Sequence, residues 1–134
     1  AEFGDMPGLL RGLSDERLAV AIRDMHARPQ HGWTVAELAR GAAMSRSGFH
    51  ERFQGAVGMA PMEYLTAWRL ALAKELLRKR EASVSEVARQ VGYRSASAFS
   101  VAFLRGVGVT PARYARGTAA APGMTAEEFE GAIA

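Results

Sequence analysis

Apolar residues recur at helical spacing through one long stretch of the chain, residues 60–80. They lie three or four positions apart, at Leu65, Trp68, Leu72 and Leu76. This spacing predicts a single apolar stripe along one helix. Pro61 suits the first turn, where a missing amide N–H costs nothing, and three bases at 78–80 suit the negative end of the helix dipole. We therefore expect one continuous helix of roughly 30 Å.

The segments on either side of this stretch resemble each other. Residues 45–64 read SRSGFHERFQGAVGMAPMEY and residues 95–114 read SASAFSVAFLRGVGVTPARY, with matching Ser, Phe, Val, Gly, Pro and Tyr. Just upstream, TVAELAR from Thr34 matches SVSEVAR from Ser83, at an offset one residue shorter. The chain thus contains an internal repeat of a two-helix unit, and the changed offset predicts turns of different length in the two copies.

Both copies open with the same helix-start pattern and continue with the same aromatic spacing. Thr34 with Glu37, and Ser83 with Glu86, each match a capping box. The second helix of each copy then carries two aromatic residues four positions apart, namely Phe49 with Phe53 and Phe99 with Phe103. A short helix, a short turn and a second helix with an apolar inner face are typical of a helix-turn-helix. Two such units, joined by a helix about one DNA turn long, predict contacts with adjacent major grooves.

The remaining pattern predicts an all-α chain with seven helices. They are expected at about 15–27, 34–43, 45–57, 60–80, 83–91, 95–107 and 110–116. Ser14 and Thr110 are the predicted N-caps of the first and the last. Residues 1–14 are predicted to be a linker or an expression remnant, 15–117 the folded domain, and 118–134 an acidic tail that can form a short helix. His26 and His31 lack the spaced partners of a metal site, so we expect histidines at the surface or at a helix end.

Positive charge is concentrated in the repeated region. Residues 34–117 hold thirteen Lys or Arg against six Asp or Glu, a net +7, whereas 1–33 carry −1 and 118–134 carry −3. This division suits a polyanionic partner such as nucleic acid, although a basic protein with no such partner would show it too. The absence of Cys excludes disulfide and thiolate chemistry and fits a reducing cytoplasm. No apolar run approaches the ~18 residues that span a membrane.

The ordered pattern resembles the DNA-binding domain of AraC/XylS-type transcription regulators. The resemblance covers Asp15–Arg116 and is carried by MSRSGF…RF…GMAPMEYLTAWRL…A..LL from Met44 to Leu77 and SVSEVARQVGYRSASAFSVAF…GVTPARY from Ser83 to Tyr114. It implies two homeodomain-like helix-turn-helix units joined by a long connecting helix, and sequence-specific binding to double-stranded promoter DNA at the bacterial nucleoid. It also implies RNA polymerase as a partner, as in an activator, an N-terminal effector or dimerisation domain in the full-length protein, and no cofactor or metal.

In the first unit, the face opposite the Phe pair carries the candidate base contacts. They are Arg46, Ser47, His50 and Glu51, and the resemblance points to the same positions. Arg46 can donate two hydrogen bonds to guanine, and Glu51 can accept one from cytosine N4. His50 can donate or accept, depending on its tautomer. Two alternatives stay open: Arg46 can contact a phosphate or only solvent, and Glu51 can pair with Arg52 or Arg46.

The equivalent face of the second unit is small and largely apolar. It carries Ala96, Ser97, Ser100 and Val101. Ala96 and Val101 can touch thymine methyl groups, and the hydroxyls read bases only weakly; alternatively, this unit mainly holds the DNA backbone. The resemblance implies a basic residue where Val101 and Leu104 stand, and an Arg where Glu51 stands, so the chain departs from the family pattern there. Candidate phosphate contacts in the two units are Arg52, Arg94, Ser95, Arg113 and Arg116.

The sequence thus favours a DNA-binding regulator over two other classes. A helical protein-interaction module with incidental basic charge is the alternative. An enzyme is disfavoured, since Glu63 and Glu75 form no credible acid–base pair and no nucleophile stands with a base. DNA-repair relatives of this domain use a reactive Cys, which the chain lacks.

Overall fold

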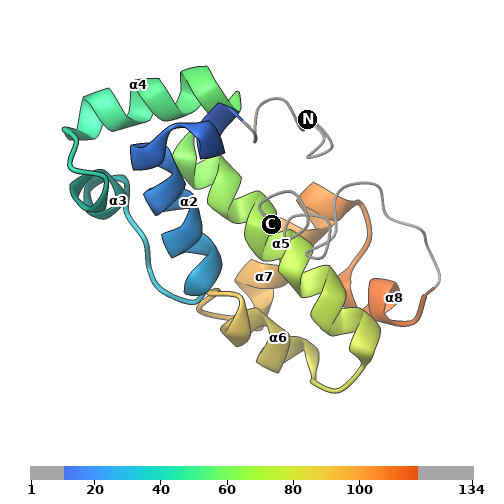
Figure 1. Ribbon diagram of the computed structural model, residues 1–134. Helices are drawn as coiled ribbons and strands as arrows, with labels where there is room; N and C mark the ends of the chain where they lie inside the picture. The colour runs from blue at the N-terminus through green and yellow to red at the C-terminus, as the bar shows by residue number, and fades with distance from the viewer. Residues whose placement is uncertain (1–10, 118–134) are drawn as a thin grey trace.

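The computed structural model describes residues 11–117, and every regular element in that range is a helix (Figure 1). The helices are α2 (Glu16–Ala27), α3 (Val35–Gly41), α4 (Arg46–Val57), α5 (Pro61–Lys79), α6 (Val84–Gln90), α7 (Ala96–Val107) and α8 (Pro111–Ala115). They correspond one by one to the seven predicted helices. The all-α prediction is confirmed, and the predicted helix 60–80 is the continuous helix α5. The expected tail at 118–134 lies outside the described residues.

Helix α5 runs between α2–α4 on one side and α6–α8 on the other (Figure 1). It contributes to two separate hydrophobic cores. The first core contains Leu65 and Trp68 of α5, whereas the second contains Leu70, Ala73 and Leu77. At about 100° per residue, these two sets lie on roughly opposite sides of the helix. The predicted stripe is therefore present but incomplete: Leu72 packs against both cores and Leu76 against the second, and the buried side formed by Leu70, Ala73 and Leu77 was not predicted. The sequence pattern hid this because each side supplies its own spacing of three and four.

The first core is closed by α2, α3 and α4, and the second by α6, α7 and α8. In the second unit, the second half of α5 packs on the helix-turn-helix pair as α2 does in the first unit. Buried residues of the first core include Leu18, Ile22, Met25, Trp33, Leu38, Phe49, Phe53, Tyr64, Leu65 and Trp68. Those of the second include Leu70, Leu77, Val87, Val91, Phe99, Phe103, Val107 and Tyr114. Each unit thus has an apolar centre of its own, with α5 shared between them.

The internal repeat is confirmed in three dimensions by two equivalent aromatic stacks. Phe49 and Phe53 lie 5.7 Å apart between ring centroids, and Phe53 meets the Tyr64 ring edge-on at 5.8 Å. In the second unit, Phe99 and Phe103 lie 5.6 Å apart, and Phe103 meets the Tyr114 ring edge-on, also at 5.6 Å. Edge-to-face pairs of this kind add to the stability that burial supplies.

The two helix-turn-helix turns differ by one residue, as the offset predicted. The first comprises residues 42–45 and the second residues 91–95. Both begin alike, since the amides of Met44 and Tyr93 each donate across the helix end over 2.9 Å, to the carbonyls of Ala39 and Ala88. This is the Schellman closure of a helix. The additional residue of the second turn is Arg94, which directly precedes the N-cap of α7.

Two predicted helix starts differ in the structure. Asp15, not Ser14, caps α2, because its carboxylate accepts from the amides of Arg17 and Leu18, while the Ser14 hydroxyl donates to the Arg11 carbonyl instead. At α3 only half of the predicted capping box forms. Thr34 accepts from the Glu37 amide, but the Glu37 carboxylate turns away from the box. The box predicted at Ser83 and Glu86 is complete.

Residues 11–14, which were predicted to belong to a linker, are part of the folded domain. Residues 11–14 form a helical turn, in which Leu13 packs on the first core and Arg11 Nε donates to the Ala56 carbonyl at 3.2 Å. Gly12 is buried, and a Cβ there would lie 2.7 Å from Val57. The Gly content suggested a flexible segment, whereas Gly12 permits close packing against the end of α4. Residues 1–10 lie outside the described range.

Candidate nucleic-acid interface

Helix α4 holds the candidate residues of the first unit by anchoring its opposite face. The Ser45 hydroxyl caps the helix by accepting from the Gly48 amide at 3.1 Å, and the buried Phe49 and Phe53 fix the inward side. The outward side carries the exposed Arg46, Ser47 and Glu51 and the half-buried His50. With Val35 of α3, these four residues line one open hollow of about 570 Å³. The four predicted residues therefore lie together on a single surface.

The charged groups around that hollow are available for a partner. Within the described part of the chain, Arg46 and Glu51 take part in none of the ion pairs. The suggested pairing of Glu51 with Arg52 is not found. Arg52 Nε instead donates to the Asp15 carboxylate, at the N-terminus of α2.

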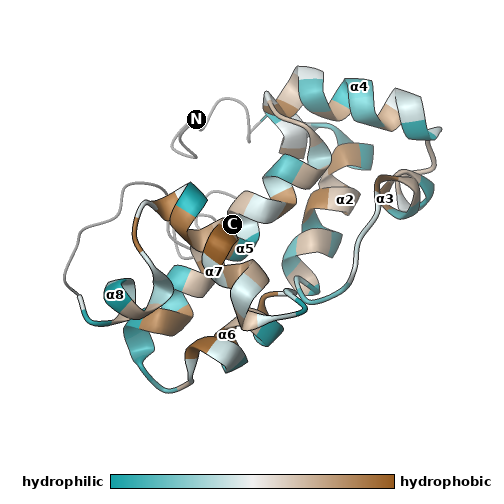
Figure 2. Cartoon of the chain, turned by 180° about the vertical axis from the view of Figure 1, so that it is seen from behind, coloured by the Kyte–Doolittle hydropathy of each residue, from teal (hydrophilic) through white to brown (hydrophobic). Residues whose placement is uncertain are grey.

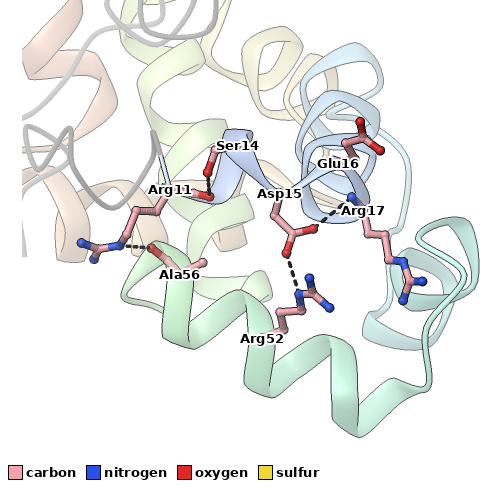
Figure 3. Close-up of a pocket in the computed structure, with 7 residues that line it drawn as sticks. All are labelled: Arg11, Ser14, Asp15, Glu16, Arg17, Arg52 and Ala56. Atoms are coloured by element: carbon pink, nitrogen blue, oxygen red, sulfur yellow. Dashed lines mark hydrogen bonds and ion pairs between the residues drawn. The ribbon is translucent and has the colours of Figure 1, made fainter.

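The Asp15–Arg52 pair belongs to a polar pocket that sequence reasoning missed (Figure 3). Arg11, Arg17 and Glu16 also line this open pocket of about 580 Å³. Partial burial raises the pKa of Asp15, but the bond from Arg52 and those from the α2 amides outweigh it, so the pKa falls below its ordinary 3.8. Among residues 11–117, Arg52 is engaged through Nε alone, and its two terminal amino groups can serve another acceptor.

Helix α7 presents a different surface from α4. Its N-cap is Ser95, whose hydroxyl accepts from the Ala98 amide at 3.1 Å and keeps its own proton to donate. Ser97 and Val101 are exposed, whereas Ala96 and Ser100 are half-buried. Figure 2 shows hydrophobic colours along α7, where α4 is largely hydrophilic.

Leu104 extends the apolar face of α7 by one further turn. Leu104 is 49% exposed and Val101 is 56% exposed, so two large apolar residues face outward at a spacing of three. Sequence reasoning noted Leu104 only as a departure from the family pattern. Its place three residues after Val101 was the signal that could have added it to the candidate surface.

The candidate phosphate contacts are distributed around both units. Arg94, Arg113 and Arg116 are exposed. Arg94 stands in the turn directly before α7, and Arg113 and Arg116 lie in α8 and at its end. Long cationic side chains at helix starts and turns suit the positions that phosphates occupy along a groove.

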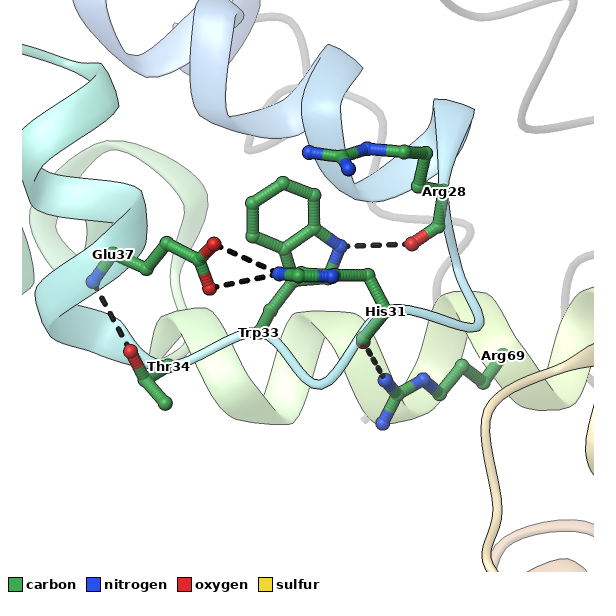
Figure 4. Close-up of polar contacts among 6 residues, drawn as sticks. All are labelled: Arg28, His31, Trp33, Thr34, Glu37 and Arg69. Carbon is green, nitrogen blue, oxygen red and sulfur yellow. Dashed lines mark hydrogen bonds and ion pairs between the residues drawn. The ribbon is translucent and has the colours of Figure 1, made fainter.

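The two histidines outside the candidate surface, His26 and His31, contact other residues of the fold. His26 was expected at the surface or at a helix end; it lies in the last turn of α2, but its ring stacks on Trp68 at 3.9 Å and its Nε2 shares a 2.7 Å hydrogen bond with the Tyr64 hydroxyl. Burial lowers its pKa to about 4. His31 pairs with the Glu37 carboxylate at 2.8 Å (Figure 4). Across residues 11–117, no cluster of three or more His, Cys, Asp or Glu could hold a metal ion.

None of the helices described here has the length and hydropathy that crossing a lipid bilayer requires.

Comparison with known proteins gives one consistent answer. The model of a family described as a helix-turn-helix domain matches residues 38–117. A Streptomyces antibioticus protein named as an AraC-like transcription regulator is 49% identical over 107 residues, which are 80% of this chain and 35% of that protein. The transcriptional regulator AlkR of Acinetobacter baylyi is 39% identical over 114 residues, 85% of this chain and 37% of its own length. The chain thus spans little more than a third of these relatives.

The fold is similar to that of solved DNA-binding domains of transcription factors. The DNA-binding domain of AdpA, whose crystal structure was solved in complex with a target DNA, aligns with a TM-score of 0.71 and 34% identity. The alignment covers 77% of this chain and 92% of that one. The residues that the family model matches begin within α3 and include α4, the shared helix α5 and the second helix-turn-helix unit. With its repeated units, its outward-facing α4 and α7 and these relatives, the chain belongs to the AraC-type helix-turn-helix family of transcription regulators.

Proposed function

We propose that this chain recognises promoter DNA by placing α4 and α7 in adjacent major grooves of one duplex. The observation that carries the proposal is the outward face of α4, where Arg46, His50 and Glu51 surround one hollow and the two charged groups have no ion-pair partner among the described residues. Arg46 and Glu51 are exposed on the side of α4 that faces away from the core, so their donors and acceptors can reach base edges in a groove. The target DNA in the AdpA complex supports the same role here.

The two recognition helices divide the work between them. Ser47 and the three α4 residues named above read bases in the first box. In the second, Ala96, Ser97, Ser100 and Val101 contact thymine methyls and offer weak hydroxyl donors. Phosphates are held by Arg94, Ser95, Arg113 and Arg116, and by the terminal amino groups of Arg52, whose Nε stays on Asp15.

Further parts of the proposal concern the whole protein. Because the chain spans about a third of its relatives, we place an effector or dimerisation domain elsewhere in the full-length regulator, RNA polymerase as its partner, and its site of action in the cytoplasm at the bacterial nucleoid. The chain itself has no enzymatic role in this scheme. The exposed Val101 and Leu104 favour one competing function, a protein-interaction surface on α7.

Selection of bound duplexes from random sequence, followed by titration over a salt series, tests the proposal. We expect an enriched bipartite motif, and an affinity that falls steeply with salt because phosphate contacts release counterions. Combined substitution of Arg46, His50 and Glu51 by Ala should abolish the motif, while the matched control Arg23→Ala, at an exposed position of α2, should keep it. No enriched motif and no salt dependence would favour the protein-interaction module instead.

A further inference from the structure

Arg69, near the middle of α5, reaches out of its helix to another part of the chain (Figure 4). Its Nε donates to the Pro29 carbonyl at 2.9 Å, and its Nη2 donates to the His31 carbonyl at 2.8 Å. Both acceptors lie in the loop between α2 and α3. One planar guanidinium thus holds two backbone carbonyls in a fixed fork, a geometry for which Arg is suited and Lys is not.

The same side chain also meets the second unit. The Arg69 guanidinium carbon lies 6.0 Å from the ring centroid of Tyr93, in the turn before α7. At this point Gly92 approaches so closely that an added Cβ would lie 2.5 Å from the Pro29 carbonyl oxygen and 2.8 Å from Arg69 Nε. The loop that leads into α3 and the turn that leads into α7 are therefore in contact through Arg69, with no room for a side chain between them.

This joint lies away from the axis of α5, which otherwise connects the two units. A single helix bends and twists along its length, so it leaves the relative orientation of its two ends partly free. A second contact off the axis removes that freedom. We propose that Arg69 is a positioning residue that fixes the orientation of α7 relative to α4, and thereby sets the spacing between the two DNA boxes that the protein accepts. The proposal rests on the proposed function.

Spacing is sensitive to such a joint because DNA is helical. One added base pair moves the second box by about 3.4 Å and rotates it by roughly 36° around the duplex. A rigid protein can meet only one such arrangement without strain, whereas a flexible one can meet several. Rigidity also raises the affinity for two boxes together, because engagement of the first box presents the second helix at a high effective concentration.

The first experiment measures the joint without DNA. Since the sequence has no Cys, spin labels can be placed through Gln54→Cys on α4 and Arg105→Cys on α7, both exposed, and their distance distribution recorded. Arg69→Ala should broaden the distribution. The matched control is Arg78→Ala, also on α5. This variant loses the contacts with Glu75 of α5 and with the Tyr114 ring of α8, neither of which connects the two units. That control should leave the width unchanged.

The second experiment measures spacing on duplexes that carry the selected boxes with zero, one or two base pairs added or removed between them. The unsubstituted protein should show a sharp optimum. Arg69→Ala should bind the optimum about tenfold more weakly, because the loosened protein presents its second helix at a lower effective concentration. It should also show a smaller penalty at neighbouring spacings. Binding to each box alone should stay the same. If Arg69→Ala does not fold, Arg69→Lys provides the test, because it keeps the charge and stem but not the fork.

Two results would overturn the proposal. One is a label distance as narrow in the Arg69 variants as in the unsubstituted chain; the other is a loss of affinity that is equal at every spacing. Both differ from failure of the proposed function, in which the unsubstituted protein itself would select no bipartite motif. The distance measurement needs no DNA, so it judges the joint even in that case.

Discussion

The hydrogen-bonding patterns of Arg46, His50 and Glu51 differ from one another. Base pairs likewise differ in the donors and acceptors that they present in the major groove. Arg46 donates from a planar fork, the Glu51 carboxylate accepts, and His50 does either. All three lie on the exposed side of α4, around the hollow beside Val35. Base specificity in this protein is therefore expected to depend on single side chains.

Arg46→Ala should weaken binding to the selected site by about 1–3 kcal/mol and relax the preference at one base position. Arg94→Ala serves as its counterpart, because a phosphate contact carries no base information. It should weaken binding to all DNA sequences about equally and reduce the slope of binding affinity against salt concentration. Competition binding on a set of single-base variants measures both effects. An equal loss on every sequence for Arg46→Ala would make that residue a phosphate contact.

His26 gives the folded state a dependence on pH. Burial against Trp68 lowers its pKa from 6.5 to about 4, so the unfolded chain takes up this proton at a higher pH than the folded one. Its contribution to stability is complete above pH 6.5 and is lost as the pH falls towards 4, by at most about 3 kcal/mol. Denaturant unfolding between pH 7 and 4 measures it.

His26→Gln should remove most of that slope, since Gln does not titrate but can still bond the Tyr64 hydroxyl. Asp15 acts in a different range. Its lowered pKa means that its contribution is present above pH 3.8 and is lost only below that value, which keeps the two residues separable. A slope unchanged by His26→Gln would assign the acid sensitivity to another group.

At the scale of elements, the start of α2 links the cap of one helix to the side of another. Asp15 caps α2 and also holds Arg52 of α4. Asp15→Ala should therefore destabilise the fold by about 0.5–2 kcal/mol through the cap, while Ser14→Ala should stay within about 0.5 kcal/mol. Asp15→Asn separates the two contacts, because it keeps the cap without the charge. Thermal or denaturant unfolding compares the three variants, and equal losses for Ser14→Ala and Asp15→Ala would return the cap to Ser14.

Each helix-turn-helix turn contains one residue with a left-handed backbone conformation, and this residue differs between the two turns. Ala43 has φ +58° and Gly92 has φ +101°, both in the left-handed region. A non-glycine residue there costs roughly 1–2 kcal/mol, so Ala43→Gly should stabilise the protein by up to about 1 kcal/mol after the greater entropy of an unfolded Gly is deducted. Gly92→Ala should destabilise it, because of strain and of the 2.5 Å approach to Pro29. Chemical denaturation of both variants tests this, and a destabilising Ala43→Gly would contradict it.

At the scale of the whole molecule, two similar units present unlike surfaces. The α4 face is polar, with charged donors and acceptors, whereas α7 exposes Val101 and Leu104 beside two serines. Since direct readout needs distinct donor and acceptor patterns, we expect one well-defined box under α4 and one degenerate, thymine-tolerant box about one turn away. Base changes in the second box should each cost less than the ~1–3 kcal/mol of a typical mismatch.

Scanning every base pair of the selected site by competition binding measures this asymmetry. The α7 box should still contribute affinity through Arg94 and the start of the helix, so deleting it should weaken binding on all sequences. Two boxes of equal stringency, or a sharper box under α7, would show that the serines or Val101 read bases better than their chemistry suggests.

The sequence by itself determined the parts of this protein that depend on neighbours within about one helical turn. The caps at Ser83 and Thr110, the Phe pairs and the length of α5 follow from residues a few positions apart, and the structure contains them all. The repeat also indicated which side of α4 faces outward, because the buried Phe49 and Phe53 leave only one side for Arg46 and Glu51. The role of those residues towards DNA stays a prediction.

Only the tertiary structure decided the contacts between distant segments. Arg69 bonds carbonyls 38 and 40 residues away, Asp15 binds Nε of Arg52 from another helix, and His26 is buried by Trp68 of α5. The division of α5 between two cores belongs to the same class, because helical spacing indicates that a side is apolar but not which core it faces. A helical period contains no information on distance across the fold, so the joint between the two units becomes visible only once they are packed.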